Sequence, residues 1–135
     1  MSLQWSTGVR NAILDQIETT IGASAILKIR TGAAPASCAT ADSGTVLATL
    51  PLPSDWMAAA SAGAKAKTGT WQDTSADAAG TAAHYRLYAT DGTTCHSQGT
   101  VTATSGGGDM EVDNVVFAPG QSFTVTTFQW TAPGA

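Results

Sequence analysis

Two histidines and two cysteines are the residues of this 135-residue sequence best suited to nucleophilic or metal chemistry. Cys95 and His96 are adjacent, so on a strand their side chains point to opposite faces and cannot bind one metal ion together. His84 and Cys38 stand far from them in the sequence. None of the spacings Cys-x-x-Cys, His-Glu-x-x-His or Gly-x-Ser-x-Gly occurs. We therefore expect no catalytic residue, no bound metal and no cofactor, and predict that the protein is not an enzyme.

Three acidic residues alternate along one segment: Asp109, Glu111 and Asp113. Alternation places them on one side of a strand, where they form either a site for calcium or a basic partner, or a solvent-facing edge opposite Met110 and Val112. Calcium sites usually wrap six or more oxygen ligands around the ion in a loop, which a flat stripe does not provide. The sequence favours the solvent-facing interpretation.

Cysteine and tryptophan allow two interpretations each. Cys38 and Cys95 form either one disulfide, which a reducing cytoplasm disfavours during assembly, or two buried free thiols. Tryptophans can stack on sugars, but packing in a core or an interface is the more common role. We favour packing for most of the four, which are Trp5, Trp56, Trp71 and Trp130.

Strand patterns dominate the chain, and the segment 110–130 shows them best. Residues 110–117 begin with period-two alternation, 118–121 read Ala-Pro-Gly-Gln, and 123–130 are again rich in aromatic and β-branched residues. Proline followed by glycine favours a type II turn. Phe123 and Val125 have the opposite parity to Phe128 and Trp130, which predicts a bulge near residues 126–127.

Further strands and turns predict an all-β fold. Asp91-Gly92 is a strong hairpin signal between residues 82–90 and 93–104. A turn or short helix is expected from residue 54 to residue 60. The remaining strands are expected at residues 25–31, 45–52 and 64–71. About seven strands of this kind favour a single antiparallel β-sandwich, jelly-roll-like in type, over an α/β fold.

One helix is expected before the strands, over residues 7–21. Its apolar residues recur on one face, Ser6 or Thr7 can cap its start, and Gly22 suits its end. The face consists of Val9, Ile13, Ile17 and Ile21. We expect the helix to lie over one end or face of the sandwich. Residues 1–5 precede it as a possible arm, with Leu3 and Trp5 as interface anchors.

Composition limits the partners of this single domain, residues 1–135. Charged residues make up 12% of the chain and the net charge is −4, with the six basic residues scattered along the sequence. Such a chain has no cluster able to neutralise a row of phosphates, and no apolar run long enough to cross a membrane. Nucleic acid and membrane are therefore not expected as partners. The N-terminus lacks the basic and apolar regions of a secretory signal.

Seven short segments, spread over nearly the whole chain, form a recognisable set. They are residues 9–15, 27–35, 44–50, 73–82, 85–87, 99–101 and 120–128. Together they resemble a family of small structural proteins of tailed bacteriophages and prophages. The family motif contains no catalytic residue that could be transferred to this chain.

The resemblance implies a virion component made in the cytoplasm of a bacterial host. We expect a capsid decoration, or cement, protein that binds the major capsid protein as a homotrimer at the capsid surface. The alternative is a component of the tail or of a head fibre that binds a host-surface glycan. The copy number per virion separates the two roles, because decoration needs hundreds of copies.

Overall fold

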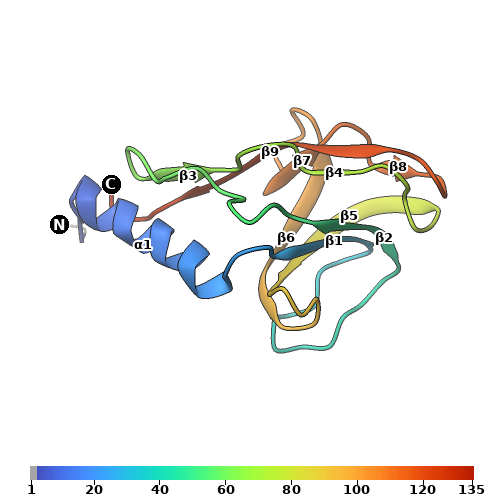
Figure 1. Cartoon of the computed structure of the whole chain (residues 1–135), viewed down its shortest axis with the longest axis horizontal. Helices are drawn as coiled ribbons and strands as arrows, with labels where there is room; N and C mark the ends of the chain where they lie inside the picture. The colour runs from blue at the N-terminus through green and yellow to red at the C-terminus, as the bar shows by residue number, and fades with distance from the viewer. Residues whose placement is uncertain (1–2) are drawn as a thin grey trace.

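The chain folds into one helix and nine strands in the computed structural model, which describes residues 3–135. Figure 1 shows α1 (Thr7–Ile21) at one end and the strands in two facing layers. The predicted all-β class with one N-terminal helix is confirmed. The long strands are β1 (Ile26–Thr31), β2 (Val46–Pro51), β5 (Gly80–Tyr88), β6 (Cys95–Ala103) and β9 (Phe123–Thr131). The short strands are β3 (Ala64–Ala66), β4 (Gln72–Asp73), β7 (Met110–Val112) and β8 (Val116–Phe117).

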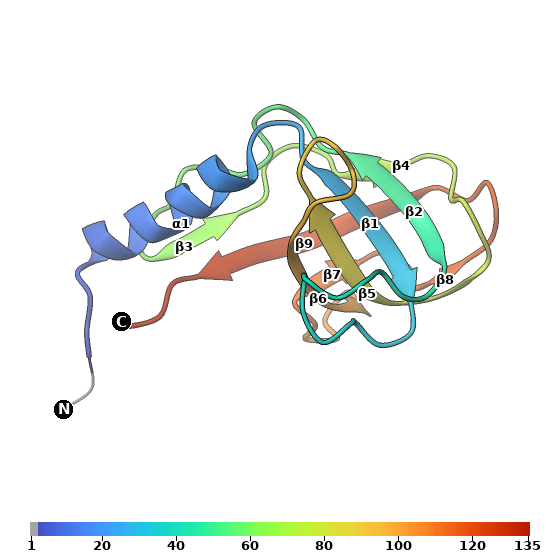
Figure 2. The ribbon, with the colours of Figure 1, turned by 90° about the horizontal axis from the view of Figure 1, so that it is seen from below.

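The helix begins and ends where the sequence predicts. The Ser6 hydroxyl accepts a hydrogen bond from the Val9 N–H at 3.2 Å, which satisfies one of the free donors of the first turn. At the other end Gly22 takes a φ of 94° and donates its N–H to the Glu18 carbonyl. Figure 2 shows that α1, β3 and the end of β9 extend together beyond the curled part of the sheet.

The strands form one curled, mixed sheet in the order β2-β1-β5-β6-β7-β9-β3, with β4 also paired to β9 and β8 to β5. The curl brings β2 near β4: the Asp73 carboxylate accepts from the Thr49 N–H at 3.1 Å. Close by, the Asp77 N–H donates to the Leu47 carbonyl at 2.7 Å. All paired strands are antiparallel except β6 and β7.

The parallel pairing of β6 with β7 corrects the purely antiparallel arrangement that the sequence suggested. It places Val101 opposite Met110. The connection is short because the chain doubles back over β6 at Gly106 and Gly108. A Cβ on either glycine would come within 2.8 Å of the Thr102 side chain, so only glycine allows this close approach.

The β7–β9 pair contains the predicted bulge. Glu111 lies opposite Thr127, whereas Val112 lies opposite Val125, so Thr126 is the extra residue on β9. The predicted turn is also present, with Gly120 at a φ of 78°.

Two local predictions were wrong, and a third was correct only in part. Residues 110–117 form two strands instead of one, because the Asn114 side chain accepts from the Val116 N–H and turns the chain toward β5. The strand predicted at residues 64–71 ends at Ala66 and the chain bends at Gly69, which has a φ of 71°. Of the turn or short helix expected over residues 54–60, the structure has a bend at Ser54 and Asp55 but no helix, since the Ala58 N–H donates to the Ala66 carbonyl and the segment runs extended beside β3.

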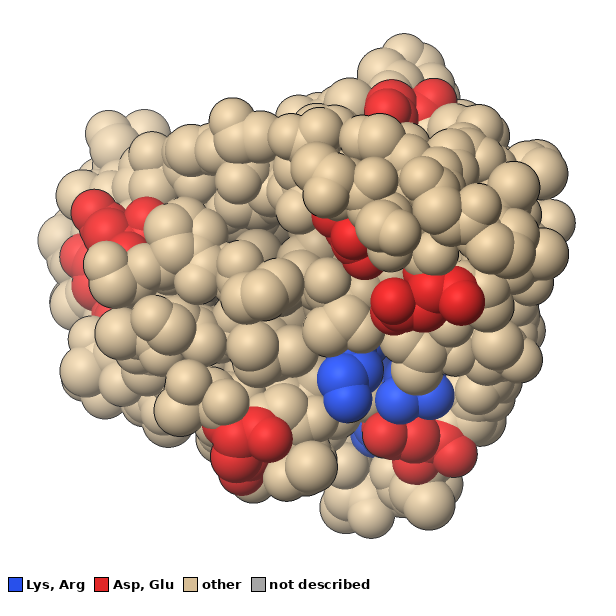
Figure 3. Space-filling view, turned by 45° about the vertical axis from the view of Figure 1, so that its right-hand side comes forward, with Lys and Arg blue, Asp and Glu red and all other residues tan. Residues whose placement is uncertain are grey.

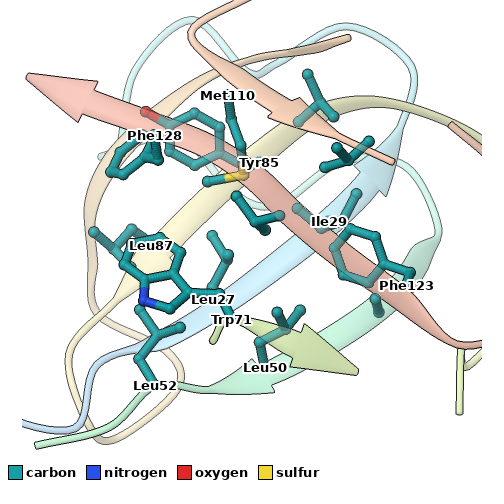
Figure 4. Packing of buried hydrophobic residues seen from close by; sticks show 14 of the residues in the cluster. Leu27, Ile29, Leu50, Leu52, Trp71, Tyr85, Leu87, Met110, Phe123 and Phe128 are labelled. Carbon is teal, nitrogen blue, oxygen red and sulfur yellow. The ribbon is translucent and has the colours of Figure 1, made fainter. Parts of the chain in front are cut away.

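The core lies between the two layers of the curled sheet. Figure 4 shows β9 crossing over β1, β2 and β5, with aliphatic side chains of β1 below aromatic ones of β9. Trp56 and Trp71 are fully buried, with ring centroids 6.1 Å apart, and Phe128 lies 5.5 Å from Trp71. Packing is therefore the role of these two tryptophans, as the sequence favoured. Trp130 is half-buried, with its ring edge-on to that of Trp56 at 5.7 Å.

Candidate functional site

The two histidines lie in different environments and do not meet. His84 is buried on β5, and its Nδ1 lies 2.7 Å from the Gly32 carbonyl, to which it donates. His96 is exposed on β6 and faces α1, while its neighbour Cys95 points to the opposite side. The predicted separation of Cys95 and His96 is confirmed.

The acidic residues 109, 111 and 113 accept hydrogen bonds from backbone groups of β6, of the loop after β6, and of β9. The Asp109 carboxylate accepts from the Thr100 N–H at 2.9 Å, Glu111 from the Gly107 N–H at 3.1 Å, and Asp113 from the Thr124 N–H at 3.1 Å. Within residues 3–135 no three His, Cys, Asp or Glu side chains are grouped so that they could hold a metal ion. The structure gives these carboxylates a role in fixing the backbone around β7.

A polar layer covers the outer face of β1 and β5. The segment 33–44, which we call the strap, crosses this face and inserts Asp42 between two arginines. The Arg30 Nη2 lies 2.9 Å from the Asp42 carboxylate, and Arg86 binds the other carboxylate oxygen. Tyr88 donates its hydroxyl to Asp42 at 2.7 Å. Sequence reasoning missed this cluster because the basic residues are scattered along the chain, although strand pairing brings them together.

The strap is further held by main-chain acceptors. The Arg86 guanidinium, 2% exposed, donates to the carbonyls of Ser37 and Thr40 at 3.0 and 3.1 Å. Gln98 on β6 donates its amide to the Pro35 carbonyl at 2.6 Å. Cys38 and Cys95 form a disulfide between strap and β6, with 5.2 Å between their Cα atoms.

The pKa directions in this layer follow from its contacts. Partial burial of Asp42 opposes ionisation, but hydrogen bonds from Tyr88 and Arg86 and the charge of Arg30 outweigh it and lower the pKa of Asp42. Burial, and the hydrogen bond to the Asp42 carboxylate, raise the pKa of Tyr88. Asp42 is therefore ionised and the polar layer is a fixed ion cluster. The strap occupies this layer.

The side of α1 that faces the protein is held by polar groups. The Arg10 guanidinium donates twice to the Ala132 carbonyl, at 3.2 and 2.9 Å. On β3, the Nζ of buried Lys65 lies 2.7 Å from both the Asp15 and the Glu18 carboxylates. Burial opposes the charge of Lys65, yet these two hydrogen bonds outweigh it and raise the pKa of Lys65. All the charged residues of the helix thus bind its own chain.

The apolar side of α1 faces outward. Val9, Ile13 and Ile17 are 41%, 37% and 37% exposed, whereas Leu14 and Ile21 are buried. The expectation that the helix lies at one end of the molecule is correct, but Val9, Ile13 and Ile17 on its apolar face are only partly covered by residues 3–135. We call Val9, Ile13 and Ile17 the ridge; the i, i+4 spacing that revealed them in the sequence does not tell which side of a helix is covered.

Two open depressions adjoin the ridge. One, of about 640 Å³, runs along α1, and the other, of about 500 Å³, lies between α1 and the end of β9. Ile13, Ile17 and His96 line both, and Trp130 lines the second. Neither contains a pair of ionisable groups suited to acid–base or nucleophilic chemistry, whereas its aliphatic lining suits protein contact.

The predicted anchors of the N-terminal arm, Leu3 and Trp5, are 72% and 43% exposed. The Trp5 N–H donates to the Gly134 carbonyl at 2.8 Å, so this segment runs beside the C-terminal residues. Residues 1 and 2 of the arm lie outside the described residues.

Most of the surface is uncharged. Figure 3 shows one face on which the few Lys and Arg atoms lie beside acidic side chains, with large neutral areas around them. No helix in the described part of the chain has the length and hydrophobicity needed to cross a lipid bilayer. No family model, curated protein or solved structure matches this chain.

Proposed function

We propose that the protein is a structural component of a bacteriophage virion, a capsid decoration protein that binds the major capsid protein as a homotrimer and stabilises the head. The observation that carries this proposal is the ridge: three aliphatic side chains exposed on a helix whose charged residues all bind groups of its own chain. A contiguous apolar surface of this kind marks a site of protein contact.

Assembly explains the features of the molecule better than catalysis does. The two clusters of ionised side chains described above, around Asp42 and around Lys65, are both occupied by partners within the described chain. We propose that this cluster, the disulfide and the strap serve to make a rigid sandwich of jelly-roll type from the two facing layers. A rigid, neutral domain suits repeated close contact with a shell.

Attachment is expected to rest on apolar and backbone contacts. Few charges are free to steer or lock the complex, so binding should depend weakly on salt. Each subunit needs only a modest interface with the shell, because a trimer that touches several capsid subunits gains by avidity. Leu3 and Trp5, both exposed, are the proposed anchors of the arm that reaches a capsid subunit.

The test is to image virions that lack this protein and to heat them beside complete virions. We expect the heads to lose a regular set of surface protrusions and to burst at a lower temperature. Adding back the purified protein should restore both properties at low and high salt, while a chain without residues 1–5 should restore them less well. If the heads are unchanged and density is missing from the tail, the proposal is wrong. The alternative, a tail or head-fibre component that binds a host-surface glycan, would then take its place.

A further inference from the structure

We propose that the ridge of α1 is covered by a second copy of this chain, so that copies pack helix against helix around a common rotation axis. The inference rests on the proposed function, because it names the partner of the surface that carries it. It assigns Val9, Ile13 and Ile17 to the subunit interface and leaves the arm with Leu3 and Trp5 for the capsid.

The distribution of charge favours an identical partner. A rotation axis brings the same groups of each copy close together, so a charge on the contact face would meet its like. The outward face of α1 carries Val9, Ala12, Ile13, Gln16, Ile17 and Thr20, none of them charged. Arg10, Asp15 and Glu18 all bind their own chain. Of these three charged side chains only Asp15, 51% exposed, remains accessible, so a basic or acidic partner would find little to pair with here.

The shape of this face also fits a copy of itself. The ridge residues follow an i, i+4 row, and the parallel row Ala12, Gln16 and Thr20 lies beside it. Helices pack by placing such a row of one into the space between rows of another. The depression between α1 and the end of β9 widens this space and adds Trp130 to its wall. Each copy thus offers both the protruding row and the groove that receives one.

The two polar side chains on the face are matched to each other. The Gln16 amide donates to the Thr20 hydroxyl oxygen at 3.1 Å within one helix. This leaves the second N–H of the Gln16 amide and the Thr20 hydroxyl hydrogen as donors, and the Gln16 carbonyl oxygen as an acceptor. The same groups of a second copy can pair this carbonyl oxygen with one of these donors, which lowers the cost of burying the face. A small-molecule ligand is less suited, because its site would need several convergent polar groups, and these depressions are open and mostly aliphatic.

The test compares a charged ridge with a charged control. Ile13→Glu combined with Ile17→Glu places carboxylates in the ridge, while Val116→Glu places one at a more accessible apolar residue, 60% exposed on β8. Light scattering after size exclusion should show an oligomer for the wild type and for Val116→Glu. The double variant should associate at least about a hundredfold more weakly, since charges brought together in an apolar contact are costly. Circular dichroism and thermal melting establish that both variants fold.

Cross-linking provides a second readout that leaves the proposed interface between copies intact. Ala12→Cys should be joined to its copy by a short bismaleimide, and Val116→Cys should not. A monomeric wild type, a double variant as oligomeric as the wild type, or an oligomer in which Ala12→Cys is not joined would each overturn the inference. An oligomer that the double variant disrupts, but that does not bind heads lacking the protein, would leave this inference standing and overturn the capsid role.

Discussion

Asp42 is the carboxylate on which the strap depends, and replacing it with asparagine should destabilise the protein by about 2–3 kcal/mol. Removing one partner of a buried ion pair typically costs 3–5 kcal/mol, because it leaves an uncompensated charge. Arg30 and Arg86 are 7% and 2% exposed, but the Asp42 side chain is 39% exposed, so solvent screens the pairs. Arg86 also keeps the carbonyls of Ser37 and Thr40 as acceptors. These two facts place the expected loss below the usual range.

The loss is measured as the difference in the free energy of unfolding in urea, and as a fall in Tm of roughly 6–12 °C for a chain of this length. Asp55→Asn is the matched control, because Asp55 is exposed and makes no ion pair or side-chain hydrogen bond within residues 3–135. The control should stay within about 0.5 kcal/mol of the wild type. A loss below about 1 kcal/mol for Asp42→Asn would refute the view that this carboxylate holds the strap.

The pH dependence tests the ionic part of the same reasoning. The pKa of Asp42 in the folded protein is below its ordinary value of 3.8, so its contribution to stability is fully present above pH 3.8. That contribution is lost as the pH falls through the lower folded pKa. The difference in unfolding free energy between the wild type and Asp42→Asn should therefore shrink below about pH 4. An equal difference at pH 3 and pH 7 would show that the carboxylate acts by shape and not by charge.

Two further predictions concern the strap and the helix. Cys38 and Cys95 lie 57 residues apart, so replacing both with serine should lower the free energy of unfolding in urea by up to about 4 kcal/mol. A loss below about 1 kcal/mol would contradict a role for the disulfide in stability. Gly63→Ala should loosen α1, because Gly63 has a φ of 75° and its added Cβ would overlap the Arg10 guanidinium. Amide hydrogen exchange in Gly63→Ala should then be faster than in the wild type in α1 and unchanged in β5. Equal exchange rates of α1 in the variant and the wild type would show that the helix does not need a glycine at position 63.

Local signals in the sequence predicted local structure well. Ser6 and Gly22 are matched to the free donors and acceptors of helix ends, so the helix bounds are correct. The parity of aromatic residues on β9 required an extra residue, and Thr126 is that residue. By contrast, the partner of each strand depends on contacts between distant segments. For this reason the sequence did not show that β8 pairs with β5 instead of β9, or that β6 and β7 run parallel.

The candidate site shows the same limit. The apolar row on α1 is plain in the sequence, but a helix can turn such a row toward or away from its own protein. The orientation is decided by Lys65 on β3, which attracts Asp15 and Glu18, and by Ala132, which accepts from Arg10. A hydrophobicity pattern considers only the aliphatic side chains. It therefore misses the polar contacts that set the orientation of the helix here. An ion pair between segments 50 residues apart leaves no local signal.

The hydrogen bond between Trp5 and Gly134 has a consequence for how this molecule can be handled. Because the first and last described segments run side by side, any tag or neighbouring domain joined at either terminus emerges at the end that carries α1 (Figure 2). A bulky fusion there would crowd the ridge and mask assembly. A short linker between the two termini would instead close the backbone into a circle, and new termini could be opened in the exposed turn between β8 and β9, at the opposite end of the molecule from α1 in Figure 2. Such a circular permutant would carry cargo outward while leaving the helical end free.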